Sequence, residues 1–213
     1  IFRAASELNV RTIAIYSHED RFAVYRFKAD EAYKIGREGE PIATYLDYKN
    51  IVQKAKEWGV DAIHPGYGFL SESSAFAREC AEAGIRFIGP SPDVLDAFGD
   101  KVTARRMALE AGLPVIPGTE DPVPDLEAAK KAAAAIGEPV TLKAVAGGGG
   151  KGIRMIQSEA ELADAFARAQ SEAMTSFGRA DIYLEKMVVR PKHIEVQVLG
   201  DSSGRIVHLY DRD

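Results

Sequence analysis

The chain has 213 residues, a net charge of −5, 46% hydrophobic residues and 28% charged residues. This is the composition of an ordinary globular protein, and the negative charge argues against general nucleic-acid binding, which usually requires a basic surface. No apolar run has the length of a membrane span, so we expect no membrane partner. The single cysteine, Cys80, has no disulfide partner within the chain, which favours a reducing compartment.

Residues 1–88 alternate between strand and helix patterns, after the apparent end of a helix at residues 1–8. Strands are predicted at residues 10–16, 32–35, 61–64 and 85–88, and helices at residues 48–58 and 73–83. Such alternation predicts a parallel sheet with helices on its faces, whose ligands bind beyond the carboxyl ends of the strands. We therefore expect residues 1–88 to form an N-terminal parallel α/β domain.

The rest of the chain has a different pattern. Residues 89–114 predict a helical linker, with helices at 93–98 and 102–111, and the proline-rich stretch 114–124 predicts a free linker. Residues 115–187 predict a compact α+β domain with helices at 126–136 and 159–174 and strands at 139–143, 153–156 and 182–186. Residues 188–213 predict the start of a third domain, with antiparallel strands at 194–199 and 206–210 around a turn at Asp201–Gly204.

The most informative stretch is the glycine run Gly147–Gly150, which has Lys143 before it and Lys151 and Arg154 after it. Glycines let backbone N–H groups approach an anion and adopt positive φ, and three cations within twelve residues predict a polyphosphate ligand. A flexible linker is the alternative, but predicted strands flank the run and it contains no serine. The run has no Gly-Lys-Ser/Thr ending and joins two strands, so it is neither a Walker loop nor a dinucleotide fingerprint.

Four charged residues have roles that the sequence pattern alone leaves open. Lys143 ends an apolar strand, where a functional contact is favoured over a snorkelling surface lysine. Glu185 and Lys186 end another strand, and they either bracket an adenosine or form a surface ion pair. Lys101 begins a helix, and its spacing does not settle its role.

Polar residues at alternate positions define a second candidate face. His193, Glu195 and Gln197 share one side of a predicted strand, which either lines a cleft or is an exposed polar face. His64 follows a predicted strand but has no second histidine or cysteine nearby at ligand spacing, so the sequence predicts no metal site there.

Six stretches resemble, in family order, the biotin carboxylase component of biotin-dependent carboxylases. They are His64–Ser73, Phe87–Pro90, Gly99–Lys101, Lys143 with the glycine run, Tyr183–Lys186 and His193–Gln197. The resemblance covers essentially the whole chain and implies an ATP-grasp fold, in which 1–88 is the N-terminal domain, 115–187 the lid domain and 188–213 the start of the C-terminal domain. Three more stretches, 25–33, 172–178 and 207–213, resemble the pyruvate carboxylase branch of this family.

The resemblance implies a ligase that carboxylates biotin with bicarbonate and ATP through carboxyphosphate, as in the first half-reaction from pyruvate to oxaloacetate. The implied cofactors are ATP, Mg²⁺ (or Mn²⁺) and biotin carried on a separate domain. By position, Lys101 and Lys143 match residues that hold ATP phosphates, and Gly149 and Gly150 match glycines that cover them. The matches to adenine, ribose and other nucleotide contacts are Glu185, Lys186, Val188 and His193.

The resemblance also implies which parts of the family's site this chain lacks and which partners it binds. The family's catalytic and metal-binding residues are expected after Asp213, and its first strand before Ile1, so we expect a fragment that binds ATP phosphates without turnover. The implied partners are ATP, bicarbonate, a biotinylated carrier domain and further copies of the protein, in the cytoplasm or the mitochondrial matrix. Two alternatives stay open: the biotin carboxylase of an acyl-CoA carboxylase, and a non-catalytic nucleotide-binding ATP-grasp relative.

Overall fold

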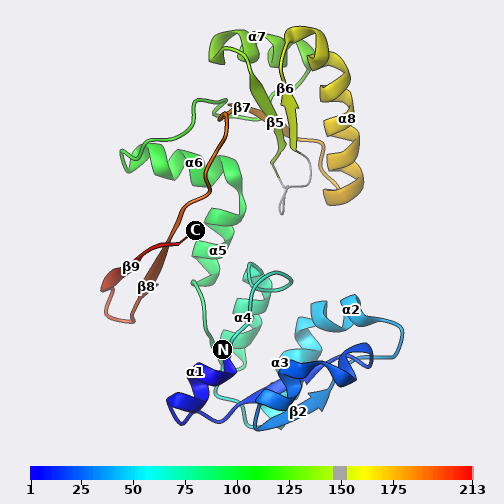
Figure 1. The fold of residues 1–213 in the computed structure, drawn as a ribbon, viewed down its shortest axis with the longest axis vertical. Helices are drawn as coiled ribbons and strands as arrows, with labels where there is room; N and C mark the ends of the chain where they lie inside the picture. The colour runs from blue at the N-terminus through cyan, green and yellow to red at the C-terminus, as the bar shows by residue number, and fades with distance from the viewer. Residues whose placement is uncertain (146–152, 213) are drawn as a thin grey trace. The chain divides into compact units, whose positions relative to one another are not determined.

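The structure is a computed structural model that describes residues 1–145 and 153–212 (Figure 1). The chain forms two compact units, Ile1–Ala104 and Arg105–Asp213. The division falls inside helix α6 (Lys101–Glu110), within the segment predicted to be a helical linker. Within the described ranges, no helix combines the length and the apolar character needed to cross a membrane.

The first unit contains short helices and two pairs of parallel strands. Strand β1 (Ile13–Tyr16) pairs with β2 (Glu31–Lys34), and β3 (Ala62–Ile63) pairs with β4 (Arg86–Phe87). The helices are α1 (Phe2–Glu7), α2 (Pro41–Leu46), α3 (Tyr48–Glu57), α4 (Ser74–Glu82) and α5 (Pro92–Gly99), with 3₁₀ helices η1 (Glu19–Phe22) and η2 (Val24–Lys28). The predicted parallel α/β class is confirmed, but the described strands form two separate pairs instead of one sheet.

Helices α3 and α4 begin at side-chain caps and bury one apolar face each. The Asp47 carboxylate accepts a hydrogen bond from the Asn50 backbone N–H at 3.2 Å, and the Ser73 hydroxyl accepts one from Phe76 at 3.2 Å. Apolar residues three and four positions apart then face the core, as the helical periodicity predicts. The buried cluster consists of Ile35, Ile51, Val52, Ala55, Phe76, Cys80 and Ile85.

Cys80 lies in α4 with no exposed surface, and burial raises the pKa of its thiol to about 11. Because the thiolate is the reactive form, we expect iodoacetamide to leave Cys80 unmodified in the folded protein at neutral pH and to modify it after unfolding in guanidinium. Mass spectrometry of the peptide that contains α4 measures this. Labelling of Cys80 in the folded protein at the rate of a free thiol would show that this core is open.

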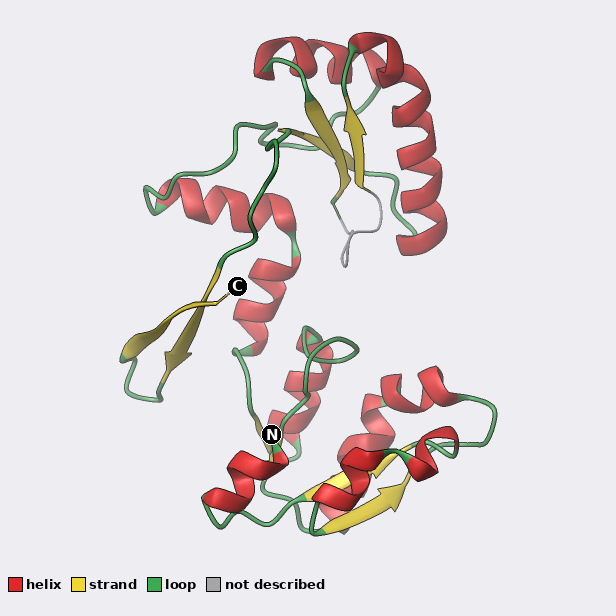
Figure 2. Cartoon of the chain, viewed as in Figure 1, coloured by secondary structure: helices red, strands yellow, loops and turns green. Residues whose placement is uncertain are grey.

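The second unit is built on a three-stranded antiparallel sheet of order β6-β5-β7. The strands are β5 (Val140–Ala144), β6 (Ile153–Ile156) and β7 (Ile182–Lys186), and the helices are α7 (Leu126–Ile136) and α8 (Glu159–Phe177). Figure 2 shows both helices beside this sheet, and their apolar residues share one core with it. The predicted strands before and after the glycine run pair with each other, while the run itself lies outside the described residues.

The proline-rich stretch before α7 is not the free connection that its composition predicts. The backbone N–H of Thr119 donates to Leu184 O at 2.9 Å, and that of Val123 donates to Ile182 O at 2.8 Å. The backbone N–H of Lys186 donates in turn to Pro117 O at 2.7 Å. This stretch therefore pairs along the outer edge of β7, because prolines restrict the backbone without preventing its other residues from pairing.

Two exposed strands, β8 (Glu195–Gly200) and β9 (Ile206–Arg212), form an antiparallel hairpin. Their turn is the predicted one, since the Asp201 carboxylate accepts hydrogen bonds from the N–H groups of Ser203 at 2.9 Å and Arg205 at 3.1 Å. The register shifts between Val196 and Val198, so the regular alternation that was predicted to place His193, Glu195 and Gln197 on one side is interrupted in β8.

Candidate functional site

The register of β5 and β7 places Lys143 and Glu185 on one face of the sheet. Thr141 lies opposite Glu185, and Lys143 lies opposite Tyr183. Side chains alternate along a strand, and the intervening residues of β5 are buried in the core with α7 and α8. The opposite face, here called the Lys143 face, therefore carries these four side chains.

Three charged side chains meet on the Lys143 face. The Lys143 ammonium donates a short hydrogen bond to Glu185 Oε2, and Arg105 Nη1 lies 3.9 Å from Glu185 Oε1. All three are shielded, since the exposed fractions of the side chains are 26% for Lys143, 13% for Glu185 and 12% for Arg105. Two cations share one carboxylate, so the cluster has one positive charge in excess. A shielded, net-positive cluster of this kind favours an anionic ligand.

Gly118 allows the chain to approach this cluster closely. It bridges to Glu185 across the edge of β7, and an added Cβ would lie 2.5 Å from the carbonyl oxygen of Leu184. Real Cβ atoms do not approach backbone so closely, so a side chain at this position would push the segment away from β7. Gly118 thereby helps to fix the backbone that carries Glu185.

Tyr183 lies beside this cluster and is 4% exposed. Burial raises the pKa of its phenol, the Glu185 charge raises this pKa further, and Arg105 opposes them. Since the unfolded phenol ionises near pH ~10, the unfolded chain loses this proton first as pH rises. The stability that neutral Tyr183 contributes is therefore fully present below that pH and is lost as pH rises above it.

We expect Tyr183 to ionise only when the second unit unfolds. In an ultraviolet titration of tyrosinate, Tyr183→Phe should leave the absorbance rise below the alkaline unfolding transition unchanged and reduce only the rise that accompanies unfolding. If Tyr183→Phe instead shows a smaller absorbance rise than the wild type while both proteins are still folded, water reaches Tyr183 on the Lys143 face.

Lys186 does not join Glu185 in the structure. Its ammonium donates to the backbone carbonyls of Gly137 at 2.7 Å and Glu138 at 2.9 Å, where α7 ends. Consecutive residues of a strand point to opposite faces, which explains why the sequence neighbours separate. Of the two residues predicted to bracket an adenosine, Glu185 and Lys186, only Glu185 therefore lies on the Lys143 face.

The other predicted site residues lie elsewhere along the chain. Lys101 begins α6 in the first unit, where Asp100 accepts a hydrogen bond from the Thr103 N–H at 2.8 Å. Val188 is exposed just after β7, and His193 is exposed and lies before β8 instead of in it. Gly149 and Gly150 lie outside the described residues.

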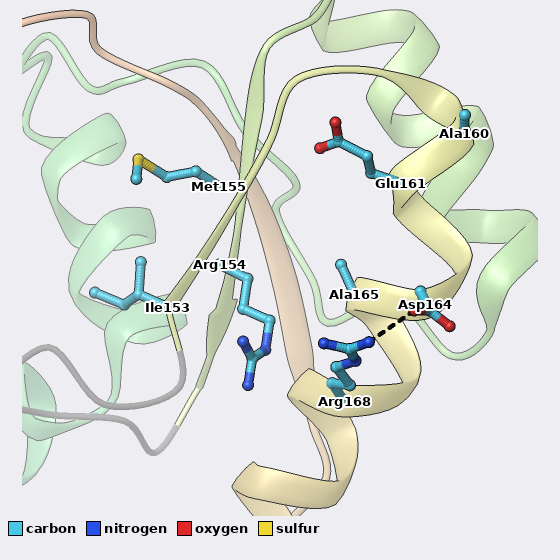
Figure 3. A pocket seen from close by; sticks show the side chains of 8 residues that line it. All are labelled: Ile153, Arg154, Met155, Ala160, Glu161, Asp164, Ala165 and Arg168. Atoms are coloured by element: carbon cyan, nitrogen blue, oxygen red, sulfur yellow. Dashed lines mark hydrogen bonds and ion pairs between the residues drawn. The ribbon is translucent and has the colours of Figure 1, made fainter.

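A hollow of about 610 Å³ lies between β6 and α8 (Figure 3). Its lining includes Arg154, which pairs with Glu172 at 2.8 Å, and Arg168, which pairs with Asp164 at 2.9 Å. Arg154 stands opposite Leu142 of β5, on the sheet face that packs against the helices. Each of the two arginines that line the hollow is already paired with a carboxylate, so the hollow competes poorly with the Lys143 face as an anion site.

Arg105 and Tyr183 were not predicted as site residues. Tyr183 had a sequence signal, because it stands two positions before Glu185 on the same strand and thus on the same face. Arg105 had no sequence signal that distinguishes it from Arg106, because only folding brings Arg105 to Glu185. Among residues 1–145 and 153–212, no group of three or more histidine, cysteine or acidic side chains is arranged to hold a metal ion.

Two family models together cover nearly the whole chain. One, described as the N-terminal domain of biotin carboxylase, matches residues 1–95, and one described as the ATP-binding domain of the carbamoyl-phosphate synthase L chain matches residues 100–213. A pyruvate carboxylase of Staphylococcus aureus is 56% identical over all of this chain, which spans 18% of that protein. The mitochondrial pyruvate carboxylase of Mus musculus is 51% identical, and the chain again spans 18% of it.

Solved structures agree with the family models. A biotin carboxylase from Campylobacter jejuni, described as a complex with beta-gamma-ATP, has a TM-score of 0.93 and 44% identity over 99% of this chain and 47% of its own. The biotin carboxylase domain of a Hydrogenobacter thermophilus 2-oxoglutarate carboxylase, solved with MgADP and bicarbonate, has a TM-score of 0.92 and 48% identity over 99% of this chain and 46% of its own. This chain belongs to the biotin carboxylase family, as an N-terminal domain followed by an ATP-binding domain.

Proposed function

We propose that this chain forms the nucleotide-binding part of an ATP-dependent biotin carboxylase, which catalyses the first half-reaction of a pyruvate carboxylase. The observation that carries the proposal is the shielded, net-positive cluster of Lys143, Glu185 and Arg105 at the end of the strand that leads into the glycine run. The solved relatives are described with ATP-type nucleotides and bicarbonate, and those ligands fit an anion site of this chemistry.

Residue roles follow from position. Lys143 neutralises nucleotide phosphates, while Glu185 and the chain through Lys186 and Val188 receive the adenosine. For Lys101 the family resemblance alone supports a phosphate contact. The Lys186 ammonium donates to backbone carbonyls in the structure, so for Lys186 the family resemblance alone supports a nucleotide contact. For Gly149, Gly150 and His193 the family resemblance alone supports a nucleotide contact.

The proposed reaction is a phosphoryl transfer followed by a carboxyl transfer. Bicarbonate oxygen attacks the γ-phosphorus and the bond to ADP breaks, giving carboxyphosphate. This splits into phosphate and carbon dioxide, and a ureido nitrogen of biotin gives its proton to the released phosphate and bonds to the carbon dioxide. In such transfers positioning and charge neutralisation do most of the work, and these are what the lysines supply.

Magnesium or manganese would neutralise the phosphates further when bound. The described residues do not provide a cluster that fits such an ion, so no ligand is assigned here. The proposed partners are a carrier domain with covalent biotin and a second copy of the protein, since one solved relative is described as a dimer. The relatives include bacterial and mitochondrial proteins, so we place the activity in the cytoplasm or the mitochondrial matrix.

The test is release of phosphate from MgATP by the full-length gene product. We expect release to require both bicarbonate and biotin, and carboxyl transfer to pyruvate to yield oxaloacetate. Phosphate release that ignores bicarbonate, or nucleotide binding without cleavage, would contradict the proposal and support a non-catalytic relative. Carboxylation of acetyl-CoA or propionyl-CoA instead of pyruvate would support an acyl-CoA carboxylase.

A further inference from the structure

Arg105 occupies an unusual position for an arginine on a helix at the edge of a unit. Its side chain is 12% exposed, its Nη1 lies 3.9 Å from Glu185 Oε1, and its Nε is buried without a hydrogen-bond partner in the described part of the chain. Buried arginines normally satisfy their donors, because an unpaired donor away from water is costly. The long ion pair and the unpaired Nε show that Arg105 is not optimally bonded in this state.

The neighbouring arginine shows what an ordinary position on this helix is like. Arg106 is 69% exposed, and its Nε lies 4.0 Å from Glu110 on the next turn. Such exposed pairs contribute little to stability. The two residues are adjacent and chemically identical, so their difference lies only in what Arg105 faces, namely the Glu185 carboxylate.

Glu185 divides its two oxygens between two cations, with Oε2 bonded to Lys143 and Oε1 facing Arg105. A lysine ammonium has three donors, so Lys143 can contact a nucleotide phosphate while it still faces Glu185, but the phosphate competes with Glu185 for its positive charge. Without another cation, a shift of the ammonium toward the phosphate would leave a shielded carboxylate unpaired, and a buried unpaired charge is strongly unfavourable. Arg105 is the cation already in place on the other oxygen.

We propose that Arg105 is a positioning residue of the nucleotide site: it keeps Glu185 paired when Lys143 turns to a nucleotide phosphate. The inference rests on the proposed function, because it assumes that Lys143 binds phosphate. Arg105 need not touch the nucleotide. Its Nε has no hydrogen-bond partner among the described residues, so the guanidinium has a donor with which to approach Glu185 more closely as the Lys143 ammonium shifts.

The test compares Arg105→Met with Arg106→Met in the full-length gene product. Arg105→Met should weaken MgADP binding, measured by calorimetry, by about tenfold or more, because truncating one partner of a buried charge pair leaves the other without compensation. The KM for ATP should rise similarly while kcat at saturating ATP changes little, as expected for loss of uniform binding. Arg106→Met should match the wild type in both measurements.

Two further variants separate positioning from a purely structural role. Arg105→Lys keeps the charge and should recover much of the affinity, and Arg105→Met should cost far less in a Glu185→Gln background, where no carboxylate needs a partner. Equal nucleotide affinity of wild type and Arg105→Met would overturn the inference. So would an equal loss in the Glu185→Gln background, which would mean that Arg105 acts independently of that charge.

The failures of the two proposals are distinguishable. If the wild-type protein binds MgADP and Lys143→Ala weakens that binding while Arg105→Met does not, the role of Arg105 is wrong and the nucleotide site stands. If the wild-type protein binds no nucleotide, the proposed function is wrong, and the inference is overturned with it.

Discussion

Lys143→Ala should lower kcat/KM for bicarbonate-dependent ATP cleavage by the full-length gene product by about a hundredfold or more, the usual effect of removing a preorganised donor to developing charge. Lys143 is the cation on β5 nearest in sequence to the glycine run, and the register of β5 and β7 holds it on a shielded face. Removing it deletes both the positive excess of the cluster and the ammonium that we propose contacts the phosphates. Steady-state phosphate release measures the effect.

Lys130→Ala is the matched control. Lys130 lies on α7 and forms an exposed ion pair with Glu127 at 2.8 Å, away from the Lys143 face. Its removal should leave kcat/KM within about twofold of the wild type, as for most surface changes distant from a site. Comparable activity of Lys143→Ala and Lys130→Ala, with both proteins folded, would remove Lys143 from the site.

Leu142→Ala should destabilise the second unit by about 2–5 kcal/mol, the range for truncating a fully buried leucine. Leu142 has no exposed surface and lies at the centre of the core between the sheet and the helices α7 and α8. Because it neighbours Lys143 on β5, the loss should also weaken the site by loosening the strand. The opening free energy from hydrogen exchange of β5 and β7 amides measures the effect within the intact protein.

The control for this change is Leu109→Ala on α6. Leu109 is 44% exposed in the same unit, so its truncation removes little buried contact and should cost about 0.5 kcal/mol or less. Equal losses for the two variants would contradict the assignment of Leu142 to a packed core.

The sequence predicted the elements of the second unit well because their patterns are strong. The bounds predicted for α7 and β7, residues 126–136 and 182–186, match the structure, and the two strands around the glycine run pair as expected. Apolar periodicity and flanking turn residues report directly on such elements. Three described strands of the first unit, β1, β3 and β4, were predicted longer than they are, since an apolar run does not show how far its backbone is paired.

The site was less predictable because it depends on contacts between distant segments. Pairing between β5 and β7 decides that Glu185 meets Lys143 while Lys186 does not, and a shift of one residue would reverse this. The proline-rich stretch gave no signal that Gly118 would lie against Glu185. Arg105 is separated from Glu185 by most of the second unit, and nothing local distinguishes it from Arg106.

The most direct test of the Lys143 face as the nucleotide site is lysine acetylation by acetic anhydride, read by mass spectrometry on the full-length gene product. Lys143 and Lys130 belong to the same unit and are both partly exposed, with 26% and 36% of the side chain accessible. Saturating MgADP should slow acetylation of Lys143 by about tenfold or more, because only the nucleotide-free fraction stays reactive, and should leave Lys130 unchanged. An unchanged acetylation rate at Lys143 with nucleotide demonstrably bound would contradict the account.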